Sequence, residues 1–425
     1  MSEPTAENAG IVTDFALHCG SSTVLRPGSP RSVGLDPAPI EAAIDAVRSF
    51  ESAPAGGHPR YPGAVAMMGH HGRIVATDAS GYSLLYADAG TQVARHERIP
   101  MRRNTIFDMA SVSKLFTSIV AVQQMECQKL VLEAPVATYL PDFASNGKQD
   151  VTIRHLLTHT SGFTSWLPLY SKYPDKESRL RAVREAPLIN PPGSTYLYSD
   201  LNMISLAMVV EKITGKSLDV LVRNGITSPL RMRDTGYNPA ARLRRRIAAT
   251  EFQVVPDRGM VWGEVHDENA WSLDGVAGHA GVFSTADDLA VLSQTLLNGG
   301  SYRDTRILSE QSVQMLITDY NGNFPGNAHG LGFELDQDWY MGGLSGPRTA
   351  GHTGYTGTTI VINFDTGSFA LLLTNRVHPS RSWGSINPAR VAWANGLASA
   401  MDPADRSVTS RLEQAPAGSS GRAEH

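Results

Sequence analysis

A serine and a lysine three residues apart, Ser111 and Lys114, are the residues of this sequence best suited to chemistry. Apolar residues at helical spacing follow Ser111, so we expect a buried helix that begins near it and carries both side chains on one face. A helix N-terminus offers such a serine free backbone N–H groups and a positive dipole. Burial lowers the pKa of a lysine, so we expect Lys114 to take the hydroxyl proton. The pair predicts an activated nucleophile. The apolar positions are Val112, Leu115, Phe116, Ile119 and Val122.

The Ser-x-x-Lys spacing alone is weak, because it arises by chance in most chains of this length. The alternative is a helix-capping serine followed by a solvated lysine. Two observations argue against it. Only 7 of the 37 basic residues are lysines, and none of them precedes Lys114. In addition, Lys114 opens an apolar run instead of lying on a polar face.

Three further segments carry residues that suit such a nucleophile. Tyr198 precedes a predicted helix and can carry a proton if a nearby cation lowers its pKa; the alternative is a packed tyrosine whose hydroxyl caps the helix. In residues 351–357, glycines would let a strand backbone approach a ligand closely. Residues 155–163 hold two histidines in a compact, turn-like segment, for which we favour a structural role. The second segment reads Gly351-His352-Thr353-Gly354-Tyr355-Thr356-Gly357.

The composition suits a globular protein with a substantial core, because 41% of the 425 residues are hydrophobic and 18% are charged. The net charge is −4, which predicts neither a nucleic-acid partner nor a membrane surface as partner. No apolar run reaches transmembrane length. The two cysteines lack metal or redox spacing. The polar, acidic residues 1–10 lack the features of a secretion signal, so we expect a cytoplasmic protein.

The elements that must position these residues are strands near both ends of the chain and helices between them. This order predicts an α/β (α+β) fold, with a sheet lobe built from about 35–110 and 305–400 and an inserted helical lobe at about 111–304. A pocket between the lobes is the expected site. We expect an irregular leader at 1–34 and a disordered tail at 401–425. The expected elements include strands at 64–68, 74–77, 358–364 and 369–373 and helices at 203–213, 286–297 and 387–401.

These motifs, in this order, resemble the serine β-lactamase and penicillin-binding-protein superfamily, most closely its class C-like hydrolases. That group includes esterases, D-amino-acid peptidases and transacylases. Ser111 to Lys114 matches the Ser-x-x-Lys motif, Tyr198 to Asp200 the Tyr-x-Asn position, and His352 to Gly354 the Lys/His-Thr-Gly position. The resemblance covers about residues 35–400 and implies a β-lactamase/DD-peptidase-like fold with an antiparallel sheet. Residues 156–162, 229–235 and 278–285 also look like family hallmarks, expected outside the site.

The resemblance implies a role for each matched residue. Ser111 would attack a carbonyl, Lys114 would take its proton, and Tyr198 would relay a proton to the leaving group. The backbone N–H groups of Ser111 and Tyr355 would form the oxyanion hole. His352 would stand in for a lysine and either orient Tyr198 or bind a polar group of the substrate. The implied substrate-binding residues are Asp200, Thr353 and Gly354, and we expect neither a metal nor a cofactor.

Two departures from the family pattern weaken an antibiotic-hydrolysing or cell-wall function. Asp200 replaces an asparagine and cannot donate to an amide carbonyl when it is ionised. His352 gives no fixed positive charge for a substrate carboxylate at neutral pH. We therefore expect an enzyme that passes an acyl group from a small-molecule donor to water, or to an amine or alcohol acceptor. The alternatives are a β-lactamase or D,D-carboxypeptidase and, from another class, a sensor that is acylated without turnover. The oligomeric state stays open.

Overall fold

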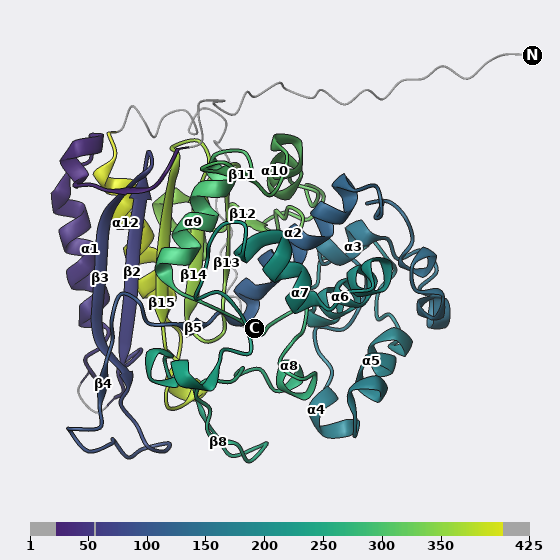
Figure 1. Cartoon of the computed structure of the whole chain (residues 1–425), viewed down its shortest axis with the longest axis horizontal. Coiled ribbons are helices and arrows are strands. Elements are labelled where there is room, and N and C mark those ends of the chain that lie inside the picture. The colour runs from purple at the N-terminus through teal and green to yellow at the C-terminus, as the bar shows by residue number, and fades with distance from the viewer. Residues whose placement is uncertain (1–22, 55–56, 403–425) are drawn as a thin grey trace, which may run out of the picture.

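The computed structural model describes residues 23–54 and 57–402 of the chain. Its main sheet has eight strands in the order β1-β3-β2-β15-β14-β13-β12, with β4 paired to β3. All pairs are antiparallel except β1 with β3, and β2 from the N-terminal part lies beside β15 from the C-terminal part. The predicted sheet from both chain ends is thereby confirmed (Figure 1). The strands are β1 (Arg26–Pro27), β2 (Gly63–His70), β3 (Arg73–Leu84), β4 (Ile99–Pro100), β12 (Glu334–Leu335), β13 (Thr349–Thr353), β14 (Thr358–Asn363) and β15 (Ser368–Thr374).

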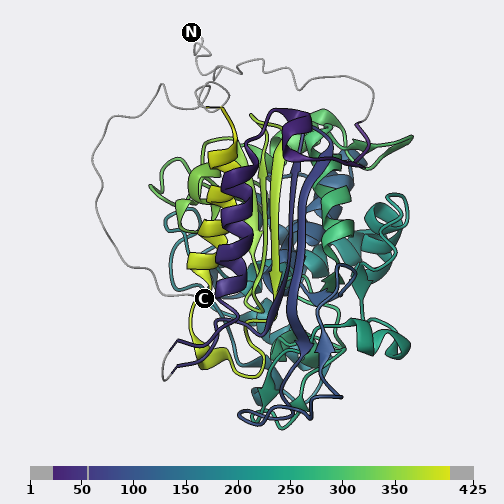
Figure 2. The same cartoon turned by 90° about the vertical axis from the view of Figure 1, so that its left-hand side faces the viewer.

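Two helices, α1 (Pro37–Ser49) and α12 (Asn387–Ala400), lie side by side over one face of this sheet (Figure 2). The Asp36 side chain caps α1 by accepting the Ala38 N–H at 3.0 Å. The helices approach closely because Gly396 lacks a side chain, and a Cβ there would come within 2.3 Å of the Ala43 Cβ. Alternate residues of β2 face this layer, including Ala66 and Met68. The layer closes the side of the sheet that faces away from the candidate site.

The other face of the sheet packs against α9 (Ala286–Leu297) and then against the helical lobe, which holds most of the remaining helices (Figure 1). The centre of this lobe is α2 (Ser113–Glu126), whose first ten residues are all buried. Its long companion α6 (Asp200–Thr214) ends at Gly215, which has a φ of 67°. The other helices are α3 (Ile153–Leu157), α4 (Leu169–Lys172), α5 (Lys176–Glu185), α7 (Leu218–Val222), α8 (Glu268–Ser272), α10 (Glu310–Ile317) and α11 (Asp338–Met341).

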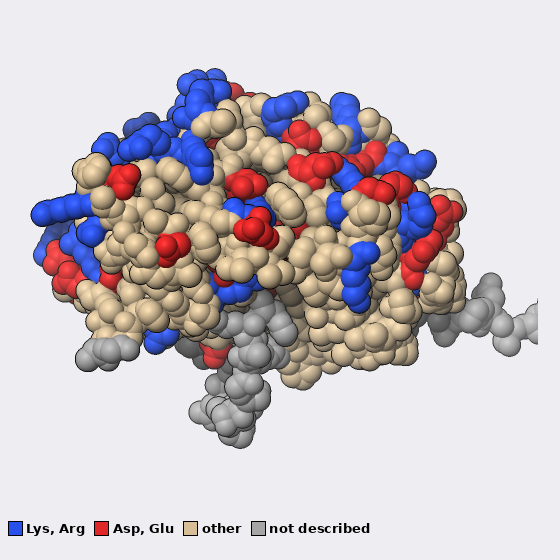
Figure 3. Space-filling view, turned by 90° about the horizontal axis from the view of Figure 1, so that it is seen from below, with Lys and Arg blue, Asp and Glu red and all other residues tan. Residues whose placement is uncertain are grey.

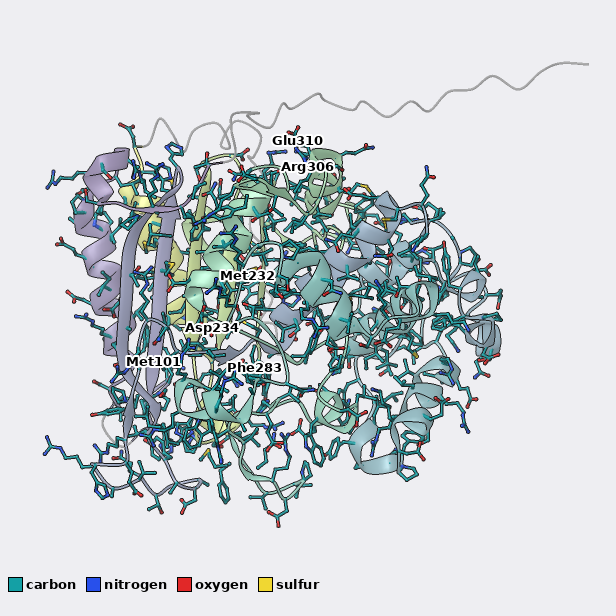
Figure 4. The ribbon with its side chains drawn as sticks, viewed as in Figure 1. Met101, Met232, Asp234, Phe283, Arg306 and Glu310 are labelled. Carbon is teal, nitrogen blue, oxygen red and sulfur yellow. The ribbon has the colours of Figure 1, made fainter. Side chains whose placement is uncertain are left out.

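A small three-stranded sheet in the order β5-β9-β6 joins the two lobes, and its strand β5 ends shortly before Ser111 in the sequence. Phe283 of β9 is buried in the large core, and Asp234 lies near it beside β6 (Figure 4). An Asp234–Arg246 ion pair, with 2.7 Å between Oδ2 and Nη2, ties this junction together. The short strands outside the main sheet are β5 (Phe107–Asp108), β6 (Gly236–Tyr237), β7 (Phe252–Gln253), β8 (Gly259–Met260), β9 (Val282–Ser284), β10 (Ser301–Tyr302) and β11 (Thr305–Arg306).

Several expected elements agree with the structure. The helix expected at 286–297 is α9, and the hairpin expected around 365–367 joins β14 to β15. Residues 1–22 of the expected leader at 1–34 lie outside the described residues. The rest of it is not wholly irregular, because it contains β1 and a 3-10 turn at Pro30–Val33. Most of the expected tail, 403–425, also lies outside the described residues. Within the described part of the chain, none of the helices has the length and apolar character needed to cross a membrane.

Candidate active site

A strained turn presents Ser111. It lies in a 3-10 turn, Ala110–Val112, so α2 begins two residues later than the helix start expected near Ser111. Ala110 has a φ of 45°, which is uncommon for a residue with a side chain. Asp108 holds this conformation: its Oδ1 accepts the Ala110 N–H at 2.9 Å and its Oδ2 accepts the His266 N–H at 2.6 Å. The buried carboxylate thus fixes the backbone immediately before the candidate nucleophile.

Ser111 and Lys114 form the predicted contact, and Asp200 is a third residue that contacts the lysine. Lys114 Nζ donates to Ser111 Oγ at 2.8 Å and to the His279 carbonyl oxygen at 3.1 Å. The same nitrogen lies 2.8 Å from Asp200 Oδ1, and only 1% of the Lys114 side chain is exposed. Asp200, expected only as a substrate-binding residue, therefore contacts Lys114 directly.

The expectation of a lowered lysine pKa is wrong. Burial does act to lower the pKa of Lys114, but the charge of Asp200 and the contact with Tyr198 outweigh it, so the pKa is raised. The resting lysine is then an ammonium ion that donates to Ser111. It can become a base for the serine proton only after it gives up its own proton, and Asp200 Oδ1, at 2.8 Å, is a carboxylate oxygen within reach of that proton. The sequence argument failed because it treated the lysine as a buried cation without a partner.

Tyr198 lies at the nucleophile, as expected. Its ring centroid is 4.8 Å from Lys114 Nζ, and its hydroxyl hydrogen-bonds with Lys114 and Ser111. The cap of α6 is the Ser199 side chain, which accepts the Leu201 N–H at 3.2 Å, so the helix-capping alternative for Tyr198 is wrong. Burial raises the pKa of Tyr198 to about 12 although Lys114 acts to lower it. At neutral pH the phenol is protonated and suited to donate a proton to a leaving group.

The turn between β13 and β14 is fastened to the backbone before Ser111. Thr356 Oγ1 donates to the Asp108 carbonyl oxygen at 2.7 Å, and Thr358 Oγ1 donates to the Met109 carbonyl oxygen at 3.0 Å. Gly354 allows this approach, because a Cβ there would come within 2.5 Å of the Met109 carbonyl oxygen. Among the described residues, no hydrogen bond engages the backbone N–H of Ser111 or of Tyr355. These two donors are free to serve as the expected oxyanion hole.

The two residues expected to bind substrate in this turn differ in what they offer. The Gly354 N–H donates to the Thr358 carbonyl oxygen at 2.7 Å, and its carbonyl oxygen accepts from Arg390 Nη2 at 3.0 Å. The backbone of Gly354 is therefore engaged within the protein. Thr353, the last residue of β13, is partly exposed beside it.

The Tyr355 side chain rests on a charged network. Its ring stacks on His266 at 5.9 Å between centroids, and Arg381 lies 5.7 Å from the ring. Glu251 joins these neighbours: its Oε2 lies 2.9 Å from His266 Nε2 and accepts from Arg381 Nε at 2.6 Å. Burial acts to raise the pKa of Glu251, but its partners His266 and Arg381 lower it to about 2. The network fixes the position of the Tyr355 backbone.

Sequence reasoning missed a second acid at the site. Asp267 Oδ1 lies 2.9 Å from His279 Nε2, and the His279 carbonyl oxygen contacts Lys114. The 278–285 hallmark, expected outside the site, therefore begins inside it. Among the described residues, Asp200, Asp267 and His279 are the single group of three whose ligand atoms lie within 4.8 Å of one another, as one metal ion would require. Asp200 is already paired with Lys114, and Asp267 already contacts His279, so these ligand atoms are engaged within the protein.

Sequence reasoning also missed histidines around Tyr198. His159 lies in the 155–163 segment, for which a structural role was favoured and stays a prediction, and its ring is 4.6 Å from that of Tyr198. His352, expected near Tyr198, lies 5.9 Å from it between ring centroids. His329 follows at 5.2 Å from His159. His329 belongs to none of the recognised motifs, so the sequence offered no signal for it.

Comparison with known proteins agrees with this geometry. The β-lactamase family model matches residues 47–392. An N-acetylmuramyl-L-alanine amidase of Bacillus subtilis is 34% identical over 349 residues, covering 75% of this chain and 78% of the relative. A putative D-alanyl-D-alanine carboxypeptidase of Escherichia coli is 33% identical over 363 residues, covering 77% and 81%.

Solved structures share the fold at lower identity. EstCE1, a hydrolase with promiscuous acyltransferase activity, superposes with a TM-score of 0.66 at 22% identity, covering 85% of this chain and 98% of its own. A simvastatin synthase variant from Aspergillus terreus gives a TM-score of 0.62 at 22% identity, covering 86% and 98%. With a match over most of its length, the chain belongs to the β-lactamase family and is a serine hydrolase of that fold.

Proposed function

We propose that the protein forms an acyl-enzyme at Ser111 from an ester or amide of a small molecule and passes the acyl group to water or to an amine or alcohol. The observation that carries this proposal is the buried Lys114, whose Nζ lies 2.8 Å from both Ser111 Oγ and Asp200 Oδ1. A buried lysine with only a structural role needs a carboxylate partner for its charge, but it needs no serine hydroxyl as well. An activated nucleophile needs both, because its proton must pass to a neighbouring base.

In this mechanism Ser111 Oγ attacks the substrate carbonyl while its proton passes to Lys114, which has released a proton toward Asp200. The free N–H groups of Ser111 and Tyr355 receive the developing oxyanion. Tyr198, protonated at rest, donates to the leaving group as the carbon–heteroatom bond breaks. The acceptor then enters, loses its proton to the same groups and releases the acyl product.

Transfer to an acceptor competes with hydrolysis in this scheme. A bound amine or alcohol has a large effective molarity over diffusing water. The similarity in fold to EstCE1 and to the simvastatin synthase variant makes transfer worth testing, although identities of 22% carry the fold alone. A small-molecule donor is also favoured over nucleic acid as partner, because acidic and basic side chains are interspersed on the face seen in Figure 3.

The test combines intact-mass spectrometry with product partitioning. Wild type mixed with an activated ester should gain and then lose one acyl mass, and Ser111→Ala should gain none. Ser118→Ala, a buried serine further along α2, is the matched control and should behave as wild type. At fixed donor, a rising amine or alcohol concentration should divert product from acid to amide or ester. A permanent adduct would indicate a sensor, and an unchanged acid yield across a broad acceptor panel would indicate a plain hydrolase.

A second candidate, hydrolysis of cell-wall amides, is favoured by the names of the relatives at 33–34% identity. In this case the leaving group is an amine, which Tyr198 would protonate. Against it stands His352, which supplies no fixed cation for a terminal carboxylate. The assay is release of D-alanine from a D-Ala-D-Ala peptide and of L-alanyl peptide from a muramyl peptide. Turnover of either that exceeds ester turnover in kcat/KM would replace the first candidate.

A further inference from the structure

Three arginine-rich segments, residues 102–104, 231–234 and 242–246, meet beside the small β5-β9-β6 sheet. Arg246 joins all three, because its Nη2 donates to the Asn104 carbonyl oxygen at 2.9 Å and its Nη1 donates to Asp234 Oδ1 at 2.9 Å. The fold thus gathers into one surface arginines that lie far apart in the sequence. Two of the segments can be followed in one part of Figure 4 by the labels on Met101, Met232 and Asp234.

Most of these arginines are exposed and lack a partner within the described chain. Arg103 pairs with Asp287, and the guanidinium carbon of Arg244 lies 4.6 Å from the ring centroid of Trp262. None of the other five exposed guanidinium groups forms an ion pair or a hydrogen bond with a described residue. We call the seven exposed side chains the arginine face. It consists of Arg102, Arg103, Arg231, Arg233, Arg242, Arg244 and Arg245.

Positive charge exceeds negative charge on this surface. The three segments hold eight arginines, and the acids among them and at the start of α9 are Asp234, Asp287 and Asp288, so the excess is five. Asp234 and Asp287 already pair with Arg246 and Arg103, which leaves the unpaired arginines without a counter-charge. The net charge of −4, from which the sequence predicts no membrane partner, averages over the whole chain and does not describe this face.

An exposed apolar hairpin tip adjoins the arginine face. Strands β7 and β8 form this hairpin, which projects from the lower edge of the molecule in Figure 1. Val254 and Val255 at its tip are 66% and 74% exposed, the highest values for large apolar residues in the described chain. Trp262 connects the hairpin to the face, because its ring contacts Arg244 and its Nε1 donates to the Ile247 carbonyl oxygen at 2.7 Å.

Unpaired arginines next to two exposed valines match the chemistry of an anionic bilayer surface. Guanidinium groups bind phosphate oxygens, often through two parallel hydrogen bonds. Exposed apolar side chains enter the boundary between lipid head groups and acyl chains, and electrostatic attraction to anionic lipids adds to that binding. A nucleic acid would also attract the arginines, but it would leave both valines in water. The combination therefore favours a membrane over a nucleic acid as the partner of this surface.

We propose that the arginine face and the Val254–Val255 tip form a peripheral binding surface for an anionic phospholipid bilayer. The arginines contact head-group phosphates, and the two valines enter the interface. This inference does not depend on the proposed acyl transfer, because none of these side chains belongs to the candidate site. The surface nevertheless lies near that site, since Gln253 Nε2 of the same hairpin donates to the His266 carbonyl oxygen at 2.9 Å.

The test is co-sedimentation of the full chain with lipid vesicles at low and high salt. Wild type should bind vesicles that mix phosphatidylcholine with phosphatidylglycerol, and it should bind pure phosphatidylcholine vesicles far more weakly. Salt should weaken the binding, because it screens exposed charges. Arg242→Gln/Arg245→Gln should bind the anionic vesicles about 30-fold more weakly, since each basic residue near such a surface contributes about fivefold.

Arg31→Gln/Lys129→Gln is the matched control, because it also removes two exposed charges that have no partner among the described residues. Arg31 precedes α1 and Lys129 follows α2, so neither belongs to the arginine face. The control should bind anionic vesicles as wild type does. Melting temperatures of all variants show whether a loss of binding is a loss of folding. An equal loss in the control would mean that only overall charge matters, and would overturn the proposal.

A second variant separates a bilayer from other polyanions. Val254→Ser/Val255→Ser should bind anionic vesicles about tenfold more weakly and keep the salt dependence of wild type, because it removes apolar insertion and no charge. Unchanged binding by this variant would overturn the proposed insertion. Wild type that ignores anionic vesicles at low salt, or that binds duplex DNA more tightly at equal phosphate concentration, would overturn the membrane as partner. Acylation at Ser111 is measured separately, so failure of the proposed function stays distinguishable.

Discussion

At the scale of single residues, the charge on Lys114 decides how the proposed reaction can begin. The lysine contacts Ser111 as the sequence predicts, but its partner Asp200 keeps it protonated at rest. Because Asp200 stands where the family pattern has an asparagine, Lys114 is a protonated ammonium ion at rest and not a free base. The pH dependence of acylation should report this coupling directly.

Asp200→Asn should move the acid limb of the kcat/KM profile to lower pH by about 1–3 units, because the lysine pKa falls when its carboxylate partner is removed. The sign follows from the need for neutral Lys114: the lower its pKa, the lower the pH at which acylation begins. The profile is measured with an activated ester, and Asp287→Asn, at a surface ion pair with Arg103, is the control. An acid limb that does not move would show that Asp200 does not set the charge on Lys114.

Tyr198→Phe should slow acylation by about 10²–10⁴-fold for esters with alkoxide leaving groups, and much less for p-nitrophenyl esters, whose leaving group needs no proton. The measurement is the slope of log kcat/KM against leaving-group pKa, which should steepen in the variant. Tyr237→Phe is the control, since this partly buried tyrosine donates to the Ala277 carbonyl oxygen instead. Equal losses for good and poor leaving groups would argue for a structural Tyr198.

Chelators should leave activity unchanged, and added zinc should not raise it. The one candidate metal group in the described chain, Asp200, Asp267 and His279, is already paired with Lys114 and within itself. A cation there would have to displace the lysine ammonium. Activity measured after dialysis against EDTA, with metal content by mass spectrometry, tests this. Bound metal that rises and falls with activity would contradict the expectation.

At the scale of elements, the site depends on how the β13–β14 turn is held against the residues before α2. Thr356 and Thr358 fasten the turn, while Glu251, His266 and Arg381 support Tyr355 from behind. This support carries a pH dependence of its own, because the pKa of Glu251 is lowered to about 2 in the folded protein.

Glu251→Gln should lower both stability and kcat, since it loosens Tyr355, whose N–H we propose receives the oxyanion. A shift of the pKa from 4.5 to about 2 corresponds to roughly 3 kcal/mol at pH 7. That contribution is present above the unfolded pKa and is lost as the pH falls toward 2. The difference in melting temperature between wild type and variant should therefore shrink between pH 5 and pH 3. A constant difference across this range would contradict the linkage.

Sequence patterns were sufficient to predict those elements whose structure depends on neighbouring residues in the chain. Helical periodicity with a closing Asn-Gly-Gly marks α9, and Asp-Thr-Gly between apolar runs marks the β14–β15 hairpin. The family motifs likewise identified Ser111, Lys114 and Tyr198. Such rules did not reach the charge of Lys114 or the position of His329, because both depend on side chains brought together from distant segments.

At the scale of the whole molecule, two lobes share one boundary, and the residues of the candidate site come from both of them. Ser111 and Tyr198 belong to the helical lobe, whereas His352 and Tyr355 belong to the sheet or the turn that follows it. Neither lobe holds a complete site. The strand order agrees with a sheet built from both ends of the chain. The predicted bounds of the two lobes stay a prediction.

The pairing of β2 with β15 has a consequence for folding during synthesis of the protein. Met67 pairs with Leu371, so the first long strand leaves the ribosome about 15–60 s before its neighbour, at roughly 5–20 residues per second. Throughout that interval an apolar strand edge is exposed and open to pairing with other nascent chains. Contacts of such high sequence separation also slow folding. Reactivity at Ser111 should consequently appear only with the completed chain, and a chaperone that shields β2 during translation should raise the yield of active enzyme.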